Sequence, residues 1–256
     1  MLQIRILGCG SSGGVPRVGQ GWGACDPSNP KNRRRRCSIL VQKNGLNVLV
    51  DTSPDLREQL LDAGIKELDA VIYTHAHADH VHGIDDLRPI AIQKRGVIDA
   101  FLDETTSKAL NTNFAYCFHT PAQSEYPPLL CEHRIITGNS FEIGSLACIP
   151  FNLHHGSINA LGFRFDNIAY TPDVNAIPET SIRHLENLDV WIIDALRYTP
   201  HPSHFNLEQA LNWIKRMKPK RAVLTNLHTD MDYDVLCKIL PKNVEPAFDG
   251  MHLTAE

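Results

Sequence analysis

Hydrophobic and polar residues alternate in short segments along the chain. The first segment is at the N-terminus, where Leu2, Ile4 and Ile6 are separated by Gln3 and Arg5. A period of two residues predicts a strand with one buried face. Further segments rich in β-branched and aliphatic residues predict strands at 46–50, 70–73, 97–102, 146–153, 161–165, 190–193 and 221–225.

Helical segments lie between these strands, at 54–63, 105–111, 178–187, 207–217 and 233–240. Pro54 and Pro178 stand in the first turn of two of them, and Asn206 precedes a third as an N-cap. Strands and helices that alternate along the chain predict an α/β fold. Because the sequence has no low-complexity linker and no repeat, we expect a single domain over residues 1–256.

Composition and charge narrow the class of protein. The chain has 256 residues, 43% of them hydrophobic, and a net charge of −4. This balance disfavours a nucleic-acid partner, because nucleic-acid-binding domains are usually basic. No apolar segment reaches the length of about 18 residues that crosses a membrane, and no signal peptide is evident, so we expect a cytoplasmic protein. Seven cysteines without a C-x-x-C pair predict neither a disulfide framework nor a cysteine-rich zinc site.

Gly8, Gly10 and Gly13 have the G-x-G-x-x-G spacing of dinucleotide-binding domains. That motif holds a pyrophosphate only when a helix opens directly after its last glycine. Here more glycines and prolines follow as far as residue 30, and they make a continuous helix costly. We therefore predict a long loop instead of a dinucleotide site.

Two other segments have no assigned role from pattern alone. The arginine run 33–36 is either a solvated loop or a clamp for phosphate, because guanidinium groups match phosphate oxygens in pairs. The region 112–130 is rich in aromatic residues and has little periodicity, and it could be a lid or a contact in a homodimer.

Three histidines and an aspartate follow the predicted strand at 70–73. A turn after the strand can direct His75 and His77 to one point, while a helix that begins there directs Asp79 and His80 to a second point nearby. Imidazole and carboxylate groups are common metal ligands. The pattern therefore predicts two adjacent metal sites.

This H-x-H-x-D-H pattern resembles the signature of the metallo-β-lactamase superfamily, and the chain is similar to that superfamily over its full length. The resemblance implies a four-layer αββα sandwich with the metals at one edge between the sheets. It also implies two divalent metal ions, for which zinc and manganese both suit ligands of this type.

The resemblance implies further metal ligands at later strand ends. They are His155, with His154 as the competing choice, Asp173, which bridges the two metals, and His228. The commonest relatives have a histidine directly after the Leu-Thr pair, where this chain has Asn226, so His228 needs a different backbone path.

Asp51 matches a superfamily position at a strand end that orients metal-binding histidines without contacting the metal. The alternative for this residue is a helix cap ahead of Pro54. One carboxylate could serve both purposes.

Within the superfamily, the chain most resembles phosphoribosyl cyclic phosphodiesterases and, more distantly, the endonuclease that processes tRNA 3′ ends. The resemblance is carried by GCGSSGGVP at 8–16, SHFNLEQAL at 203–211 and FDGM at 248–251. It implies that the glycines form a wall of the active site and that His204 lies beside the metals. Some relatives bind a structural zinc through clustered cysteines after this loop. Because this chain has only Cys25 there, we predict no such zinc.

The implied activity is hydrolysis of a small cyclic phosphodiester or nucleotide-like substrate by water that the metals activate. The catalytic residues are then His204, which donates a proton to the leaving group, and the carboxylates Asp79 and Asp173. Arg33, Arg36 and Ser157 are expected to bind the substrate. The alternatives are a thioesterase of the glyoxalase type and a biosynthetic or non-hydrolytic metal-binding relative. A membrane partner is not expected.

Overall fold

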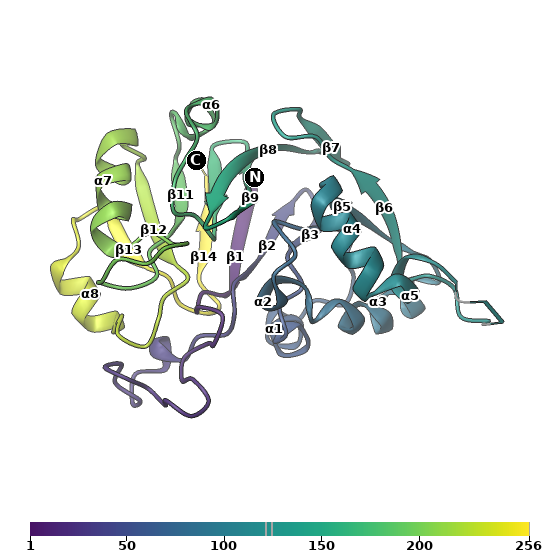
Figure 1. Cartoon of the computed structure of the whole chain (residues 1–256), viewed down its shortest axis with the longest axis horizontal. Helices are drawn as coiled ribbons and strands as arrows, with labels where there is room; N and C mark the ends of the chain where they lie inside the picture. Colours follow the sequence, from purple (N-terminus) through teal and green to yellow (C-terminus); the bar gives the residue numbers. More distant parts are fainter. Residues whose placement is uncertain (121, 124, 256) are drawn as a thin grey trace.

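The computed structural model describes residues 1–120, 122–123 and 125–255. Over these residues the chain forms two seven-stranded sheets that pack face to face, with helices on the outer face of each (Figure 1). This four-layer αββα sandwich is the predicted fold, which is therefore confirmed.

The first part of the chain forms one sheet and the following part forms the other, but the last strand of the chain returns to the first sheet. The first sheet has the order β14 (His252–Thr254), β1 (Leu2–Gly8), β2 (Ser38–Lys43), β3 (Leu46–Val50), β4 (Ala70–Ile72), β5 (Ile98–Leu102) and β6 (Leu130–Arg134). The second has the order β13 (Val244–Pro246), β12 (Arg221–Thr225), β11 (Val190–Asp194), β10 (Ile168–Thr171), β9 (Ile158–Phe165), β8 (Leu146–His155) and β7 (Phe141–Ile143).

The helices follow the same division. Those on the first sheet are α1 (Leu56–Ala63), α2 (Ala78–Val81), α3 (Arg88–Lys94), α4 (Glu104–Asn113) and α5 (Ala115–Phe118), and those on the second are α6 (Glu179–Ile182), α7 (Leu207–Met217) and α8 (Tyr233–Ile239). The predicted N-cap of α7 is confirmed, since the side chain of Asn206 accepts a hydrogen bond from the backbone of Gln209 and the Gln209 side chain accepts one in return.

Alternate side chains of each central strand enter different layers. On β3, Val48 and Val50 point into the core between the sheets, and Leu49 points into the helical layer. On β11, Ile192 points into the core between the sheets, and Trp191 points into the helical layer. Both faces of these strands are buried, which explains why they appear in the sequence as continuous apolar runs.

Most predicted elements are confirmed. The strands at 46–50 and 221–225 coincide with β3 and β12, the helix at 207–217 coincides with α7, and other ends shift by up to about three residues. The helix predicted at 178–187 is shorter, because α6 passes into a 3-10 turn at Arg183–Leu185. Three-residue strands such as β7, β13 and β14 were missed, because three residues do not establish a period. The longer elements β2, β6, β10 and α3 were also missing from the prediction.

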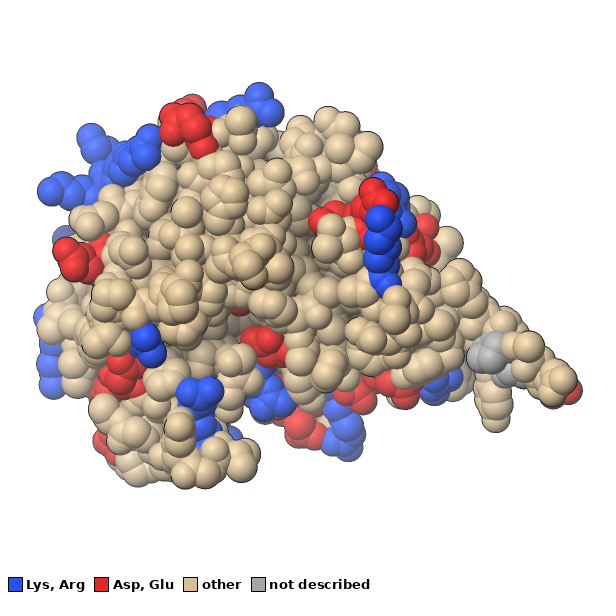
Figure 2. Space-filling view, in the orientation of Figure 1, with Lys and Arg blue, Asp and Glu red and all other residues tan. Residues whose placement is uncertain are grey.

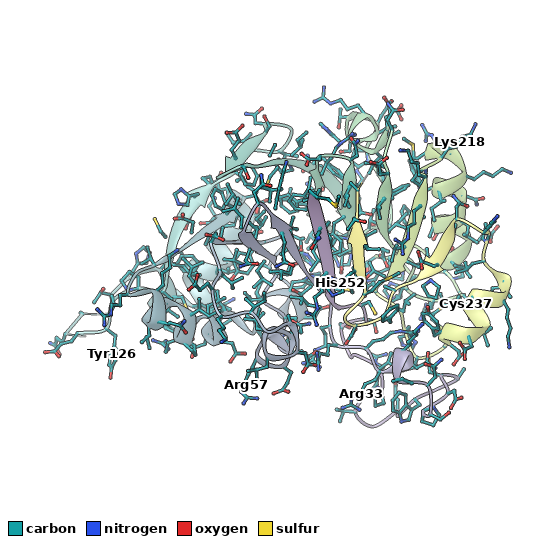
Figure 3. The ribbon with its side chains drawn as sticks, turned by 180° about the vertical axis from the view of Figure 1, so that it is seen from behind. Arg33, Arg57, Tyr126, Lys218, Cys237 and His252 are labelled. Carbon is teal, nitrogen blue, oxygen red and sulfur yellow. The ribbon has the colours of Figure 1, made fainter. Side chains whose placement is uncertain are left out.

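The region 112–130 contains the end of α4, then α5, and then a projection from the body of the molecule. Cys117 and Phe118 of α5 are buried, whereas Tyr126 lies on the projection at one end of the molecule (Figure 3). Pro121 and Ser124 lie outside the described residues. A role for this region as a lid or a dimer contact stays a prediction. None of the helices in the described part of the chain is long and apolar enough to cross a membrane.

Candidate metal centre

The candidate centre lies where strands of both sheets end. Strands β3 and β4 are parallel in the first sheet, and β10, β11 and β12 are parallel in the second, so within each sheet their carboxyl ends share one edge. His75 and His77 follow β4, His155 ends β8, and Asp173 follows β10. A hydrogen bond of 2.9 Å from the backbone of Leu161 to the carbonyl of Thr74 joins the sheets at this edge.

Four side chains converge on one point. Nδ1 of His77 is 3.0 Å from Nε2 of His75 and 3.1 Å from Nε2 of His155. Oδ2 of Asp173 is 3.4 Å from Nε2 of His155 and 3.9 Å from Nε2 of His75. Around a tetrahedral zinc with bonds of about 2.0–2.1 Å, ligand atoms are about 3.3 Å apart. These four residues therefore fit a single cation, and we call them the first ligand group.

Asp79, His80 and Asp173 form a second ligand group. Nε2 of His80 is 3.1 Å from Oδ1 of Asp173 and 3.6 Å from Oδ2 of Asp79. The two oxygens of Asp173 therefore face different groups, Oδ2 the first and Oδ1 the second. A carboxylate in this position can bridge two cations.

Hydrogen bonds from the far nitrogen orient the imidazoles. Nδ1 of His80 is 2.7 Å from Oδ2 of Asp51, and Nδ1 of His155 is 2.7 Å from the carbonyl oxygen of Ser203. Such bonds leave Nε2 free to bind a metal, and they are typical of metal-binding histidines. Asp51 also accepts two hydrogen bonds of 2.8 Å from Thr74. The structure thus places Asp51 behind His80, in the position that orients its ring. Asp51 does not cap α1, whose N-cap residue is Asp55.

Burial and neighbouring carboxylates set the protonation of these groups. Burial lowers the pKa of His75 well below its ordinary value and also lowers the pKa of His155, so both rings are neutral, which is the form that binds metals. Burial also disfavours charge on His80, but the carboxylates of Asp173 and Asp79 outweigh it and raise the pKa of His80. The second ligand group thus attracts positive charge.

His204 lies beside the first ligand group. Its Nε2 is 3.8 Å from Oδ2 of Asp173, and its Nδ1 is 2.8 Å from Oδ2 of Asp194. Burial disfavours the charged form of His204, but the carboxylates of Asp194 and Asp173 outweigh burial and raise its pKa to about 9. Sequence reasoning missed Asp194. The available signal was an aspartate at the end of an apolar strand, as at Asp51.

His228 is outside both ligand groups. Nη1 of Arg17 donates to its Nε2 at 2.7 Å. The backbone turns after β12 at Asn226, whose φ of 62° is left-handed, and the side chain of Asn226 donates to Oδ1 of Asp173 at 3.2 Å. The structure therefore places an amide against the Asp173 carboxylate and does not bring His228 to the ligand atoms.

The choice between His154 and His155 follows from the alternation of side chains on β8. His155 is buried in the first ligand group, whereas His154 is exposed and its Nδ1 lies 3.2 Å from Oδ1 of Asn159. Ser157, expected to bind substrate, is exposed in the turn between β8 and β9.

A cavity of about 410 Å³ opens beside Asp79. The glycine-rich loop forms part of its wall, through Ser12 and Gly13, and Arg17 and Arg36 also line it. As predicted, the chain after Gly13 forms a long loop, and its first helical turn is at Pro30–Asn32. In the view of Figure 2, few charged side chains lie in the middle of the face that is shown. Most Lys, Arg, Asp and Glu side chains of this face lie toward its edges.

The arginine run divides between two sides of the chain, because extended backbone directs successive side chains oppositely. Arg36 lines the cavity beside Asp79 and pairs with Asp55, with Nε 3.1 Å from Oδ2. Arg34 is buried. Arg33 lines a separate cavity of about 260 Å³ (its position on the loop is labelled in Figure 3). The structure therefore brings Arg36 to the centre but not Arg33.

Comparison with known proteins identifies the family. Residues 46–226 match the family model described as beta-lactamase superfamily domain. This match covers more than half of the chain, and the chain accordingly belongs to this family. It is a member of the metallo-β-lactamase superfamily of hydrolases.

Individual relatives agree with this assignment. The crystal structure of a new diphosphatase from the PhnP family is 35% identical, with a TM-score of 0.91, and the match covers 98% of this chain and 96% of that one. An octanoyltransferase from Porphyromonas gingivalis is 33% identical over 98% of this chain and 51% of its own length. A ribonuclease Z from Clostridium acetobutylicum is 32% identical over 39% of this chain and 27% of its own length. The chain therefore spans about half or less of these two curated relatives.

Proposed function

We propose that this chain is a phosphodiesterase that uses two divalent metal ions, zinc or manganese, to hydrolyse a small cyclic or nucleotide-like phosphodiester. The observation that carries the proposal is the position of Asp173. Its Oδ1 lies 3.1 Å from His80 and its Oδ2 lies 3.4 Å from His155, so one carboxylate serves two ligand groups. Paired cations of this kind are typical of enzymes that displace groups at phosphorus.

In this proposal His75, His77, His155 and Asp173 hold one cation, and Asp79 and His80 hold the other together with Asp173. Bound cations supply Lewis acidity, which makes a water more acidic and offsets charge on phosphoryl oxygens. The protein holds the ligand side chains in position from behind, through Asp51 and the carbonyl of Ser203.

His204 is the proposed proton donor to the leaving alkoxide. The carboxylate of Asp194 beside its ring raises the pKa of His204, which favours the protonated form that can donate. Asp194 accepts the hydrogen bond from Nδ1 and so directs Nε2 toward the first ligand group, where Oδ2 of Asp173 is 3.8 Å away. A proton donor has to point at the leaving group, and this orientation points Nε2 at the place where a substrate bound at the first ligand group would lie.

The charge of the cavity favours a phosphate ester. Arg17 and Arg36 line it, and guanidinium groups bind phosphate oxygens with two parallel hydrogen bonds. Its volume of about 410 Å³ suits a small ligand. Similarity to a diphosphatase and to ribonuclease Z supports a phosphorus centre over a thioester. The transferase activity of the octanoyltransferase is not carried over, since only half of that protein is matched.

The experiment compares two substrates on protein that has been stripped of metal and reloaded with zinc or manganese. Bis(4-nitrophenyl) phosphate should be hydrolysed only after loading, and Asp173→Asn should abolish the activity while its circular dichroism spectrum remains that of the wild type. Lactoylglutathione should be a much poorer substrate. Faster hydrolysis of lactoylglutathione would favour the thioesterase alternative. Retention of metal without hydrolysis of either substrate would favour a non-hydrolytic relative.

A further inference from the structure

Three possible ligand side chains meet on the edge of the first sheet, outside the centre described above. Strands β5 and β6 are parallel, and Asp99 lies opposite Cys131 while Phe101 lies opposite His133. Because alternate residues of a strand share a face, these four side chains project from the same side. The donor atoms of Asp99, Cys131 and His133 all lie within 4.8 Å of one another.

The imidazole of His133 is held in place from two directions. Its Nε2 lies 2.8 Å from Oδ1 of Asp99. Its ring stacks on Phe101 at a centroid distance of 4.8 Å and an interplanar angle of 19°, and Phe101 stacks in turn on Phe141 of the second sheet. A ring supported in this way keeps its nitrogen directed at the aspartate and loses little entropy when it binds an ion.

We propose that Asp99, Cys131 and His133 bind a divalent cation of the zinc class. Thiolate, imidazole and carboxylate together are the ligands that zinc and cobalt prefer. In a tetrahedral site the nitrogen and the carboxylate oxygen would be about 3.3 Å apart, so the observed 2.8 Å needs to widen by only about half an ångström.

This site differs in chemistry from the centre in the proposed function, and it does not depend on that function. The two ligand groups of that centre contain histidine and aspartate, whereas this one adds sulfur. The ligands are half-exposed, with 44% of the His133 side chain and 50% of the Asp99 side chain accessible, so a water can complete the coordination. An ion here would link β6, the last strand of the sheet, to β5.

Cobalt tests the proposal through the near-ultraviolet charge-transfer band of a thiolate–cobalt bond. Metal-free wild-type protein, kept reduced, should develop this band on titration with Co²⁺, and Cys131→Ser should lack it. His133→Ala should raise the Co²⁺ concentration at half-saturation by about tenfold or more, since even residues behind a ligand change metal affinity by about 10–100-fold.

Cys237→Ser is the matched control. Among the cysteines of the described residues, Cys131 and Cys237 are the exposed ones. Cys237 lies on α8 at the far end of the molecule from the projection that precedes β6 (Figure 3). The band should be unchanged in this variant.

Three further measurements keep the test independent of folding. All three variants should retain the wild-type circular dichroism spectrum, and Cys131→Ser should retain wild-type phosphodiesterase activity. After loading with zinc, elemental analysis should find about one ion fewer in Cys131→Ser than in Cys237→Ser. A missing band in the wild type, or a band that persists in Cys131→Ser, would show that these residues are only a surface histidine–aspartate pair beside a thiol.

Discussion

Nδ1 of His204 lies 2.8 Å from Oδ2 of Asp194, and this pair approaches the centre from two separate segments. Asp194 ends β11, whereas His204 comes from the loop before α7. The buried Asp194 carboxylate orients the ring, and together with Asp173 it outweighs burial and raises the pKa of His204 to about 9.

His204→Ala should lower the turnover of an alkyl phosphodiester by about 100-fold or more, because an alkoxide needs a proton to leave. Bis(4-nitrophenyl) phosphate should lose far less, since nitrophenolate leaves without one. Steady-state kinetics with both substrates give the ratio, and elemental analysis should find unchanged metal content. Equal losses on the two substrates would rule out the donor role.

Three histidine substitutions separate metal ligands from their neighbours. His155 lies in the first ligand group, His154 faces solvent, and His228 accepts a hydrogen bond from Arg17. His155→Ala should reduce retained metal strongly, while His154→Ala and His228→Ala should retain nearly as much as the wild type. Elemental analysis after dialysis measures this. If His228→Ala loses as much metal as His155→Ala, the ligand role implied for His228 by the resemblance is correct, and Arg17 must move when metal binds.

Asn226 combines a left-handed backbone with a hydrogen bond to the Asp173 carboxylate, so two substitutions can separate these roles. Asn226→Gly keeps the φ of 62° without strain but removes the amide that donates to Asp173. Asn226→Ala removes the amide and strains the backbone by about 1–2 kcal/mol more. Urea unfolding should therefore rank stability as wild type, then Gly, then Ala. An alanine variant as stable as the glycine variant would contradict this explanation.

Asp249 makes stability depend on pH. Its carboxylate accepts hydrogen bonds from the backbone of Cys9 at 3.2 Å and Arg35 at 2.8 Å, but burial raises its pKa to about 7 from an ordinary value of 3.8. Between these values the folded chain binds more protons than the unfolded chain, so this group lowers stability as pH rises from about 4 to about 7.

Asp249→Asn removes that titration. The variant loses an acceptor at every pH, but it avoids burying a charge near neutral pH. The stability advantage of the wild type over Asp249→Asn should therefore be larger at pH 5 than at pH 8. Urea unfolding at the two values measures it, and an advantage that grows with pH would mean that the two amides keep the carboxylate charged.

The sequence allowed the layers and much of the centre to be predicted, for identifiable reasons. Strands buried on both faces, such as β11, have a clear apolar composition, and His75, His77, Asp79 and His80 are close together in the sequence. The loop after Gly13 was predicted from proline and glycine content, because both disfavour helix locally.

The rest depends on contacts between distant segments. Asp194 is a single aspartate after an apolar strand, and only the packing of His204 against it reveals a role. The left-handed turn at Asn226 directs His228 toward Arg17, and no local pattern predicts such a turn. Arg33 and Arg36 are near neighbours, yet alternation of the backbone sends them to different cavities.

The central claim is that one carboxylate joins two cation sites, and metal content measures it directly. Protein carrying Cys131→Ser, which removes the sulfur site, should retain about two zinc or manganese ions per chain. Adding Asp173→Asn should remove most of this metal while the fold is kept. A folded Cys131→Ser protein that retains no transition metal, or retains the same amount after Asp173→Asn, would contradict the account.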